Sequence, residues 1–379
     1  MQVKNLYKLT FILLISLFSC TSNKVNIKEV EEIIEDFSFY SGADLSYVNE
    51  MEDCGAIYKN NKNVITDPFQ IFANNKANLI RVRKWHNPSW TNYSNLADIE
   101  KTIKRAKGSK MKVLLDFHYS DDWADPNKQE IPKAWLPIID DLEVLGDSIY
   151  NYTYETLEKL DVKNLLPEMV QVGNETNIMI LQKDNKINPM NWKRNAFLLN
   201  KGIKAVRDIS KDKGKKIEIM LHIAQPENGL TWFKEANNNG VIDYDWIGLS
   251  YYPKWSSFNF DQTSIAIKTL IKTYNKKLMI VETSYPFTLN GVDNANNILG
   301  ADSLISEYPA TQEGQLNYLL DFKKLIKNAG GKGLIYWEPA WVSNNCSTRW
   351  GKGSHWENAT LFDFDSNPTL GISFLNPED

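Results

Sequence analysis

Histidine and cysteine are scarce in this chain, and their scarcity argues against several classes of protein. There are four histidines and three cysteines among 379 residues. No two histidines stand at the short spacing of a zinc-binding pair, so a metalloenzyme is disfavoured. Basic residues are slightly outnumbered, because the formal net charge is −4. Since nucleic-acid binding favours a basic face, this charge argues against a nucleic-acid partner.

The apolar run near the N-terminus, residues 9–18, is too short to span a bilayer. Lys4 and Lys8 precede it, which is typical of a signal peptide. The run ends in L-F-S-C at Cys20, and this sequence resembles a bacterial lipobox. We expect residues 1–19 to be a signal peptide, Cys20 to carry a lipid, and residues 20–37 to form a tether. The expected location is then a bacterial membrane, as a lipoprotein of the outer membrane on its surface or periplasmic face. An ordinary secreted protein with an incidental cysteine is the alternative.

The two other cysteines, Cys54 and Cys346, form a candidate pair. An oxidising compartment would allow them to form a disulfide. Cys54 follows the first expected strand and Cys346 follows the eighth, and these strands are neighbours if the sheet closes on itself. A bridge and two free thiols both remain open at this stage.

Eight runs rich in aliphatic and β-branched residues predict strands, at residues 39–45, 79–85, 112–119, 169–175, 217–223, 246–252, 278–284 and 333–339. Helix-length segments lie between them, for example residues 97–106, 189–210, 264–274 and 311–328. This alternation is typical of parallel βαβ units. No internal repeat or low-complexity block interrupts it. The sequence therefore predicts an α/β protein in which residues 38–379 form a single (β/α)8 TIM barrel with long βα loops at its C-terminal face.

Two of these runs end in a glutamate. V-Q-V-G-N-E-T ends the fourth at Glu175, and L-M-I-V-E-T-S ends the seventh at Glu282. Burying an unpaired carboxylate there costs free energy, so packing alone does not explain the pair. The C-terminal ends of barrel strands surround the active site in this fold. Two carboxylates facing each other there predict the acid and the nucleophile of a retaining glycoside hydrolase.

Other strands end in polar or aromatic side chains as well. Asp44, Arg83, Asp116 and His118 end the first three strands, Tyr252 ends the sixth, and Trp337 ends the eighth. Alone, Arg83 would be read as a structural ion pair and His118 as a core histidine. Such residues at one end of seven strands instead favour a catalytic mouth.

Longer motifs resemble glycoside hydrolase family 53, the arabinogalactan endo-β-1,4-galactanases. The matching phrases include G-A-D-L-S-Y-V-N-E-M-E (42–52), L-I-R-V-R-K-W-H-N-P (79–88), D-F-H-Y-S-D-D-W-A-D-P-N-K-Q (116–129), G-L-S-Y-Y-P-K-W (248–255) and Y-W-E-P-A-W (336–341). They extend over almost the whole chain after residue 40. The resemblance implies hydrolysis of β-1,4-galactan, as found in pectin side chains and type I arabinogalactan.

The resemblance also implies roles for individual residues. Glu175 would be the acid/base and Glu282 the nucleophile, with Arg83 keeping Glu282 ionised. Asn174 would bind the 2-hydroxyl of the sugar at the cleavage point. The further residues expected to shape the pocket or its neighbouring subsites are His118, Tyr252, Trp337, Asp44, Trp85, Asp116, Trp123 and Trp255.

The implied chemistry needs no cofactor or metal. Some family members bind calcium after the seventh strand, and the corresponding loop offers the oxygen ligands of Asp293, Asn294, Asn296 and Asp302. Such a loop is also typical of plain turns. Two other functions remain as alternatives: a glycan-binding lipoprotein without activity, and another retaining glycosidase of the same clan, such as a mannanase or xylanase.

Overall fold

The computed structural model describes residues 39–181 and 189–377. The chain divides into residues 1–37 and residues 38–379, and the described ranges belong to the second unit. The expected signal peptide, Cys20 and the tether therefore lie outside the described residues. Within the described ranges, no helix has both the length and the apolar character needed to cross a membrane.

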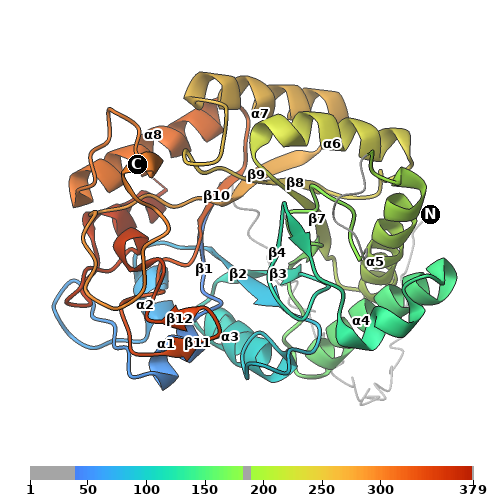
Figure 1. Ribbon diagram of the computed structural model, residues 1–379, viewed down its shortest axis with the longest axis horizontal. Coiled ribbons are helices and arrows are strands. Elements are labelled where there is room, and N and C mark those ends of the chain that lie inside the picture. Colours follow the sequence, from blue (N-terminus) through green and yellow to red (C-terminus); the bar gives the residue numbers. More distant parts are fainter. Residues whose placement is uncertain (1–38, 182–188, 378–379) are drawn as a thin grey trace, which may run out of the picture. The chain divides into compact units, whose positions relative to one another are not determined.

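Eight parallel strands close into a barrel in the order β1-β10-β9-β8-β7-β6-β3-β2 (Figure 1). They are β1 (Tyr40–Asp44), β2 (Leu79–Lys84), β3 (Lys112–Phe117), β6 (Met169–Val172), β7 (Glu218–Ala224), β8 (Trp246–Ser250), β9 (Lys277–Glu282) and β10 (Gly333–Tyr336). The order follows the sequence around the barrel and closes where β1 pairs with β10. The predicted (β/α)8 barrel is confirmed.

Helices surround the strands as an outer ring (Figure 1). They are α1 (Val48–Asp53), α2 (Pro68–Asn74), α3 (Leu96–Gly108), α4 (Leu142–Val162), α5 (Trp192–Lys213), α6 (Pro226–Asn238), α7 (Phe260–Tyr274) and α8 (Gln312–Asn328). Local signals set their ends. Asn259 and Gln262 form a reciprocal capping box at the start of α7, and Gly214 ends α5 in the left-handed conformation.

The barrel strands are buried along nearly their whole length, because side chains on one face fill the barrel and those on the other pack under helices. All seven residues of β7 are buried. The register places Asp116 of β3 beside Gln171 of β6. Their side chains meet inside the barrel, where Gln171 donates to Asp116 at 2.7 Å.

Several strands end earlier than the sequence predicts. The chain turns sharply after β3, β6 and β10, where Tyr119, Glu175 and Glu338 adopt φ values of +49°, +42° and +47°. Side chains rarely adopt this left-handed backbone, and such strain is concentrated at functional sites. The predicted strands run on to the polar residues at the mouth, whereas β3, β6 and β10 end two or three residues earlier.

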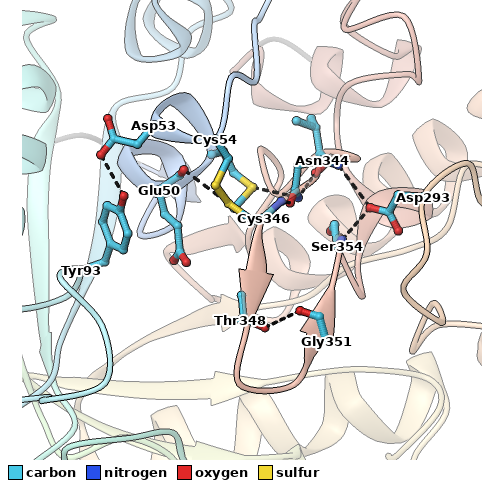
Figure 2. The surroundings of a disulfide bond; sticks show 12 residues. Glu50, Asp53, Cys54, Tyr93, Asp293, Asn344, Cys346, Thr348, Gly351 and Ser354 are labelled. Atoms are coloured by element: carbon cyan, nitrogen blue, oxygen red, sulfur yellow. Dashed lines mark hydrogen bonds between the residues drawn. A yellow bond between two sulfur atoms is a disulfide. The ribbon is translucent and has the colours of Figure 1, made fainter.

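Two short hairpins rise from the βα loops, β4–β5 (Ala124–Asp125 and Lys128–Gln129) and β11–β12 (Ser347–Thr348 and Gly351–Lys352). A disulfide joins Cys54, at the end of α1, to Cys346, just before β11, with the two Cα atoms 5.5 Å apart (Figure 2). The bridge that the sequence left open is thus present in the structure. It ties the β11–β12 hairpin to the loop region that follows β1.

Candidate active site

The two predicted glutamates meet at the C-terminal end of the barrel. Glu175 follows β6 and Glu282 ends β9, and both are more than nine-tenths buried. A carboxylate oxygen of one lies within 4.8 Å of a carboxylate oxygen of the other. Retaining glycosidases hold their carboxyls about 5–5.5 Å apart, whereas inverting enzymes leave roughly 6.5–9.5 Å for a water. The geometry is therefore that of a direct displacement by one carboxylate.

Arg81 is the cation that contacts Glu282. Its Nη1 lies 2.7 Å from Oε1 of Glu282 and 2.9 Å from Oδ2 of Asp44, and its Nη2 lies 2.7 Å from Oδ2 of Asp116. Nη2 also donates to Asn174 at 2.7 Å, and Nε donates to Gln171 at 3.1 Å. With these contacts all three nitrogens of a buried guanidinium have acceptors, as such a group requires.

The expectation that Arg83 keeps Glu282 ionised is wrong. Arg83 lies two residues further along the same face of β2, where Nη1 pairs with Oε1 of Glu338 at 3.3 Å. Its guanidinium carbon is 4.1 Å from the ring centre of Trp123 and 4.5 Å from that of Trp85. Arg83 thus supports the aromatic wall of the site through cation–π contacts.

The environments of the two glutamates give them different proton affinities. Burial raises the pKa of Glu282 to about 7, although Arg81 and a hydrogen bond from Tyr252 (3.2 Å) act to lower it. Burial and the nearby charge of Glu282 raise the pKa of Glu175 well above its usual value. Glu175 is bonded to a neutral hydroxyl, that of Ser250 at 2.5 Å, rather than to a cation. Glu282 therefore ionises first, and Glu175 keeps the proton that an acid must supply.

A cavity of about 820 Å³ opens above the two carboxyls. Tryptophan rings and polar side chains share its walls, and such a mixture of apolar surface and polar groups is usual in a ligand site. Seven of the predicted residues line it: Glu175, Glu282, Asn174, Trp123, Tyr252, Trp255 and Trp337. Trp255 is 48% exposed, so its ring is available at the rim.

The other predicted contacts lie behind this wall. Asp44 and Asp116 pair with Arg81, and His118 lies 3.0 Å from Asp116 through Nε2. Trp85 is 2% exposed and packs edge-on against Trp123. These side chains orient the groups that face the cavity, and they are not among the cavity-lining residues.

The two acidic residues among the four calcium candidates, Asp293 and Asp302, bind different protein groups. Asp293 accepts hydrogen bonds from the backbone N–H groups of Ala295 (2.8 Å), Asn344 (3.2 Å) and Ser354 (2.6 Å), the last two visible in Figure 2. Asp302 pairs instead with Lys254 at 2.8 Å. Asn296 uses its backbone carbonyl to bind His355, and Asn294 is in the same loop. Calcium binding here stays untested, and these contacts favour the plain turn that the sequence left open as the alternative.

A metal could be considered at one other place among the described residues. Glu175, His222 and Glu282 offer one ligand atom each within 4.8 Å of one another. Each already has a hydrogen-bonding partner, and Arg81 contacts Glu282 directly. Because Arg81 already pairs with the Glu282 carboxylate, the cluster fits acid/base chemistry better than metal binding.

The comparisons with known proteins agree with this geometry. The family model for glycosyl hydrolase family 53 matches residues 40–375. The chain belongs to glycosyl hydrolase family 53. An arabinogalactan endo-β-1,4-galactanase of Cellvibrio japonicus is 59% identical over 333 residues, which cover 87% of this chain and 88% of the relative. An endo-β-1,4-galactanase of Bacillus subtilis is 32% identical and covers 90% of this chain and 86% of the relative.

Solved structures of the family superpose on this member closely. The family 53 catalytic domain of Ignisphaera aggregans has a TM-score of 0.82 at 31% identity, covering 89% of this chain and 96% of that one. A fungal β-1,4-galactanase has a TM-score of 0.76 at 30% identity, covering 89% and 98%. A xylanase of Clostridium stercorarium, at 14% identity and a TM-score of 0.52, shares the fold alone.

Sequence reasoning missed several side chains of this family 53 site. Four are buried inside the barrel: Arg81, Gln171, His222 and Ser250. A signal for them exists, because each is a polar residue inside or at the end of an otherwise apolar strand. Others line the cavity from the loops that follow β10, namely Trp341, Trp350 and Trp356, or from the start of α6, namely Gln225 and Asn228. Only the folded chain brings these residues to the mouth.

Proposed function

We propose that this protein is a retaining endo-β-1,4-galactanase in which Glu175 is the acid/base and Glu282 the nucleophile. The observation that carries the proposal is the close approach of the two carboxyls, one beside Arg81 and the other beside a neutral hydroxyl. The membership of family 53 supports hydrolysis of a glycosidic bond, and the names of its relatives support galactan as the substrate.

The reaction proceeds in two steps. Glu175 donates its proton to the glycosidic oxygen while the Glu282 carboxylate attacks the anomeric carbon, so the C–O bond to the leaving sugar breaks as an ester bond forms. Glu175, now ionised, then takes a proton from water, and the resulting hydroxide equivalent displaces Glu282. Each glutamate ends in its starting state, and no cofactor takes part.

The other groups at the mouth assist by position and charge. Arg81 and Tyr252 hold Glu282 through both of its oxygens, which fixes the direction of attack. The amide of Asn174 is held by a bond to the backbone oxygen of Ala124 (2.8 Å) and by Arg81, so it presents a fixed face to the cavity. The rings of Trp337 and Trp123, with centres 5.8 Å apart, offer flat apolar surfaces to sugar rings.

We also propose that the enzyme is a lipoprotein anchored through Cys20 to a bacterial membrane, at the outer face or toward the periplasm. Support comes from the apolar run of residues 9–18 and the L-F-S-C sequence that ends it. Labelling growing cells with a radiolabelled fatty acid tests this proposal. Incorporation that is lost in Cys20→Ala supports it, and equal incorporation in both contradicts it.

The activity is tested by product release from debranched pectic galactan, with mannan and xylan as parallel substrates. Galacto-oligosaccharides from the wild type, with turnover lost in Glu175→Gln and Glu282→Gln, are the expected result. Galactan that binds without cleavage would favour the glycan-binding alternative. Cleavage of mannan or xylan instead would keep the mechanism and refute the substrate.

A further inference from the structure

The mechanism described so far gives no role to two buried polar side chains, Gln171 and His222, and uses a third, Ser250, only as the neutral neighbour of Glu175. Gln171, His222 and Ser250 are carried by β6, β7 and β8, which are consecutive in the barrel, and each is fully buried. Burying polar groups is unfavourable unless their hydrogen bonds are satisfied. Their arrangement therefore needs an explanation beyond packing.

The three side chains form a hydrogen-bonded row that ends on the acid/base. Gln171 Nε2 lies 3.1 Å from His222 Nδ1, and His222 Nε2 lies 2.9 Å from Ser250 Oγ. Ser250 Oγ then donates to Oε1 of Glu175 at 2.5 Å. At its other end, Gln171 accepts from Nε of Arg81, whose Nη1 contacts Glu282. One row of contacts thus runs from the nucleophile to the acid/base.

The number of protons on each group decides which atom donates and which accepts in each hydrogen bond of the row. The single Ser250 proton goes to Glu175, so Ser250 Oγ must accept the Nε2–H of His222. Burial and the nearby Arg81 charge keep the pKa of His222 well below its usual value, so the ring carries one proton and Nδ1 is an acceptor. Gln171 Nε2 carries two N–H groups and lies near four acceptors: Asp116 Oδ1 at 2.7 Å, Asn174 Oδ1 at 3.0 Å, the backbone oxygen of Gly173 at 3.1 Å and His222 Nδ1 at 3.1 Å. With one N–H on Asp116, the other can be donated to His222 Nδ1 in competition with Asn174 and Gly173.

The opposite direction would have a different chemical result. His222 Nδ1 also lies 2.9 Å from Oδ1 of Asn174, and a proton on Nδ1 would bond there. Ser250 would then donate to His222, and Glu175 would have to carry its proton on Oε1, facing Ser250. The ring form of His222 therefore decides which oxygen of Glu175 is protonated.

We propose that Ser250 and His222 are positioning residues that keep Oε1 of Glu175 as an acceptor, so that its catalytic proton sits on Oε2. Among the described residues no side chain or backbone group bonds Oε2, and Glu175 lines the cavity. That oxygen is the one free to protonate a leaving sugar. This inference rests on the proposed acid/base role of Glu175 and adds the groups that aim its proton.

Ser250→Ala removes the donor and is the first test. General acid catalysis contributes roughly 10²–10⁴-fold to the rate. In Ser250→Ala part of the enzyme should carry the Glu175 proton on Oε1 instead of Oε2, which should lower kcat/KM on galactan by about 10-fold or more. A 2,4-dinitrophenyl β-galactobioside has a leaving group that needs no proton, so its kcat/KM should fall by less than about threefold. The alkaline limb of the pH profile on galactan should also move upward, because the lost hydrogen bond favoured the ionised form of Glu175.

His222 is tested with two substitutions of different chemistry. His222→Gln can still present an N–H to Ser250 and should retain most of the activity, whereas His222→Leu should behave like Ser250→Ala. Joining His222→Leu with Ser250→Ala should cause little further loss, because both act through one hydrogen bond. Thr153→Ala is the matched control, since it deletes a buried hydroxyl on α4 that bonds Tyr119 at 2.8 Å away from this row.

The possible outcomes separate the inference from the proposed function. Equal losses on both substrates, with an unmoved alkaline limb, would mean that the row is merely structural and would overturn the inference. Wild-type rates in Ser250→Ala would overturn it as well. A folded wild type that cleaves no galactan would refute the proposed function itself. ¹⁵N shifts of His222 in the wild type provide an independent check, and a proton on Nδ1 instead of Nε2 would contradict the proposed direction.

Discussion

Arg81→Met removes the guanidinium that contacts Asp44, Asp116 and Glu282 inside the barrel. A neighbouring arginine typically lowers a carboxyl pKa by about 1–3 units. The pKa of Glu282, about 7 with Arg81 in place, should therefore rise to about 8–10 without it. At about 1.4 kcal/mol per unit, ionising the nucleophile becomes harder by about 1.4–4 kcal/mol. Three buried carboxyls without their cation should also lower the free energy of unfolding by about 3–5 kcal/mol at neutral pH.

The assay is the pH dependence of kcat/KM on galactan. Its acid limb reports ionisation of the nucleophile in the free enzyme. We expect this limb to move upward by about 1–3 pH units in Arg81→Met, and by less in Arg81→Lys, which keeps the charge but fewer hydrogen bonds. Thermal unfolding of each variant shows whether enough folded protein remains to interpret the rates.

Arg83→Met is the matched control, because Arg83 is on the same strand face but pairs with Glu338. It should weaken the aromatic wall and raise KM while leaving the acid limb in place. If Arg83→Met moves the acid limb and Arg81→Met does not, the assignment of Arg81 to the nucleophile is wrong.

Four further predictions concern stability, binding and metals. The folded-state pKa of Glu175 is raised, so its carboxyl contributes stability that is fully present below its unfolded pKa of about 4.3 and is lost as pH rises. Glu175→Gln should therefore have a higher melting temperature than the wild type, by a margin that grows with pH. A margin that stays constant with pH would contradict this. Replacing Cys54 and Cys346 by alanine should lower the free energy of unfolding by about 2–4 kcal/mol in denaturant titrations. If reductant lowers the free energy of unfolding of the wild type by the same amount, the loss is due to the missing disulfide. Trp255→Ala should raise KM on long galactan by up to about tenfold with kcat nearly unchanged, because an exposed ring at the rim contacts only distant sugars; a fall in kcat alone would place the ring at the cleavage point. EDTA should change neither the melting temperature nor the rate, since the acidic side chains of the candidate calcium loop already have protein partners; a loss that calcium restores would establish a structural ion.

The sequence predicts the barrel well because its strand signal is strong. Buried parallel strands need near-continuous apolar runs, and eight such runs occur with helix-length segments between them. The same pattern places Glu175 and Glu282 correctly, since each glutamate directly ends or follows a run and must lie at the mouth. For the barrel and these two glutamates, the order of residues along the chain is enough to predict their place.

The contacts between strands are harder to predict. Arg81 and Arg83 share one face of β2, and the sequence cannot show which of them reaches the level of Glu282. That level depends on the stagger of neighbouring strands, in which Arg81 lies beside Leu114 and Arg83 beside Asp116. His222 and Ser250 depend on the same stagger, so their link to Glu175 appears only when β7 and β8 are in place. The loop tryptophans depend on long connections whose path no local pattern fixes.

Time-resolved ¹H NMR of the first products tests the central claim most directly. Two carboxyls within 4.8 Å leave no room for a water between nucleophile and sugar, so the new reducing end must keep its configuration. Galacto-oligosaccharides released from galactan should appear first as the β-anomer, and the α-anomer should grow only by mutarotation. If the α-anomer appears first, the enzyme inverts, and the roles of Glu175 and Glu282 as acid/base and nucleophile are wrong.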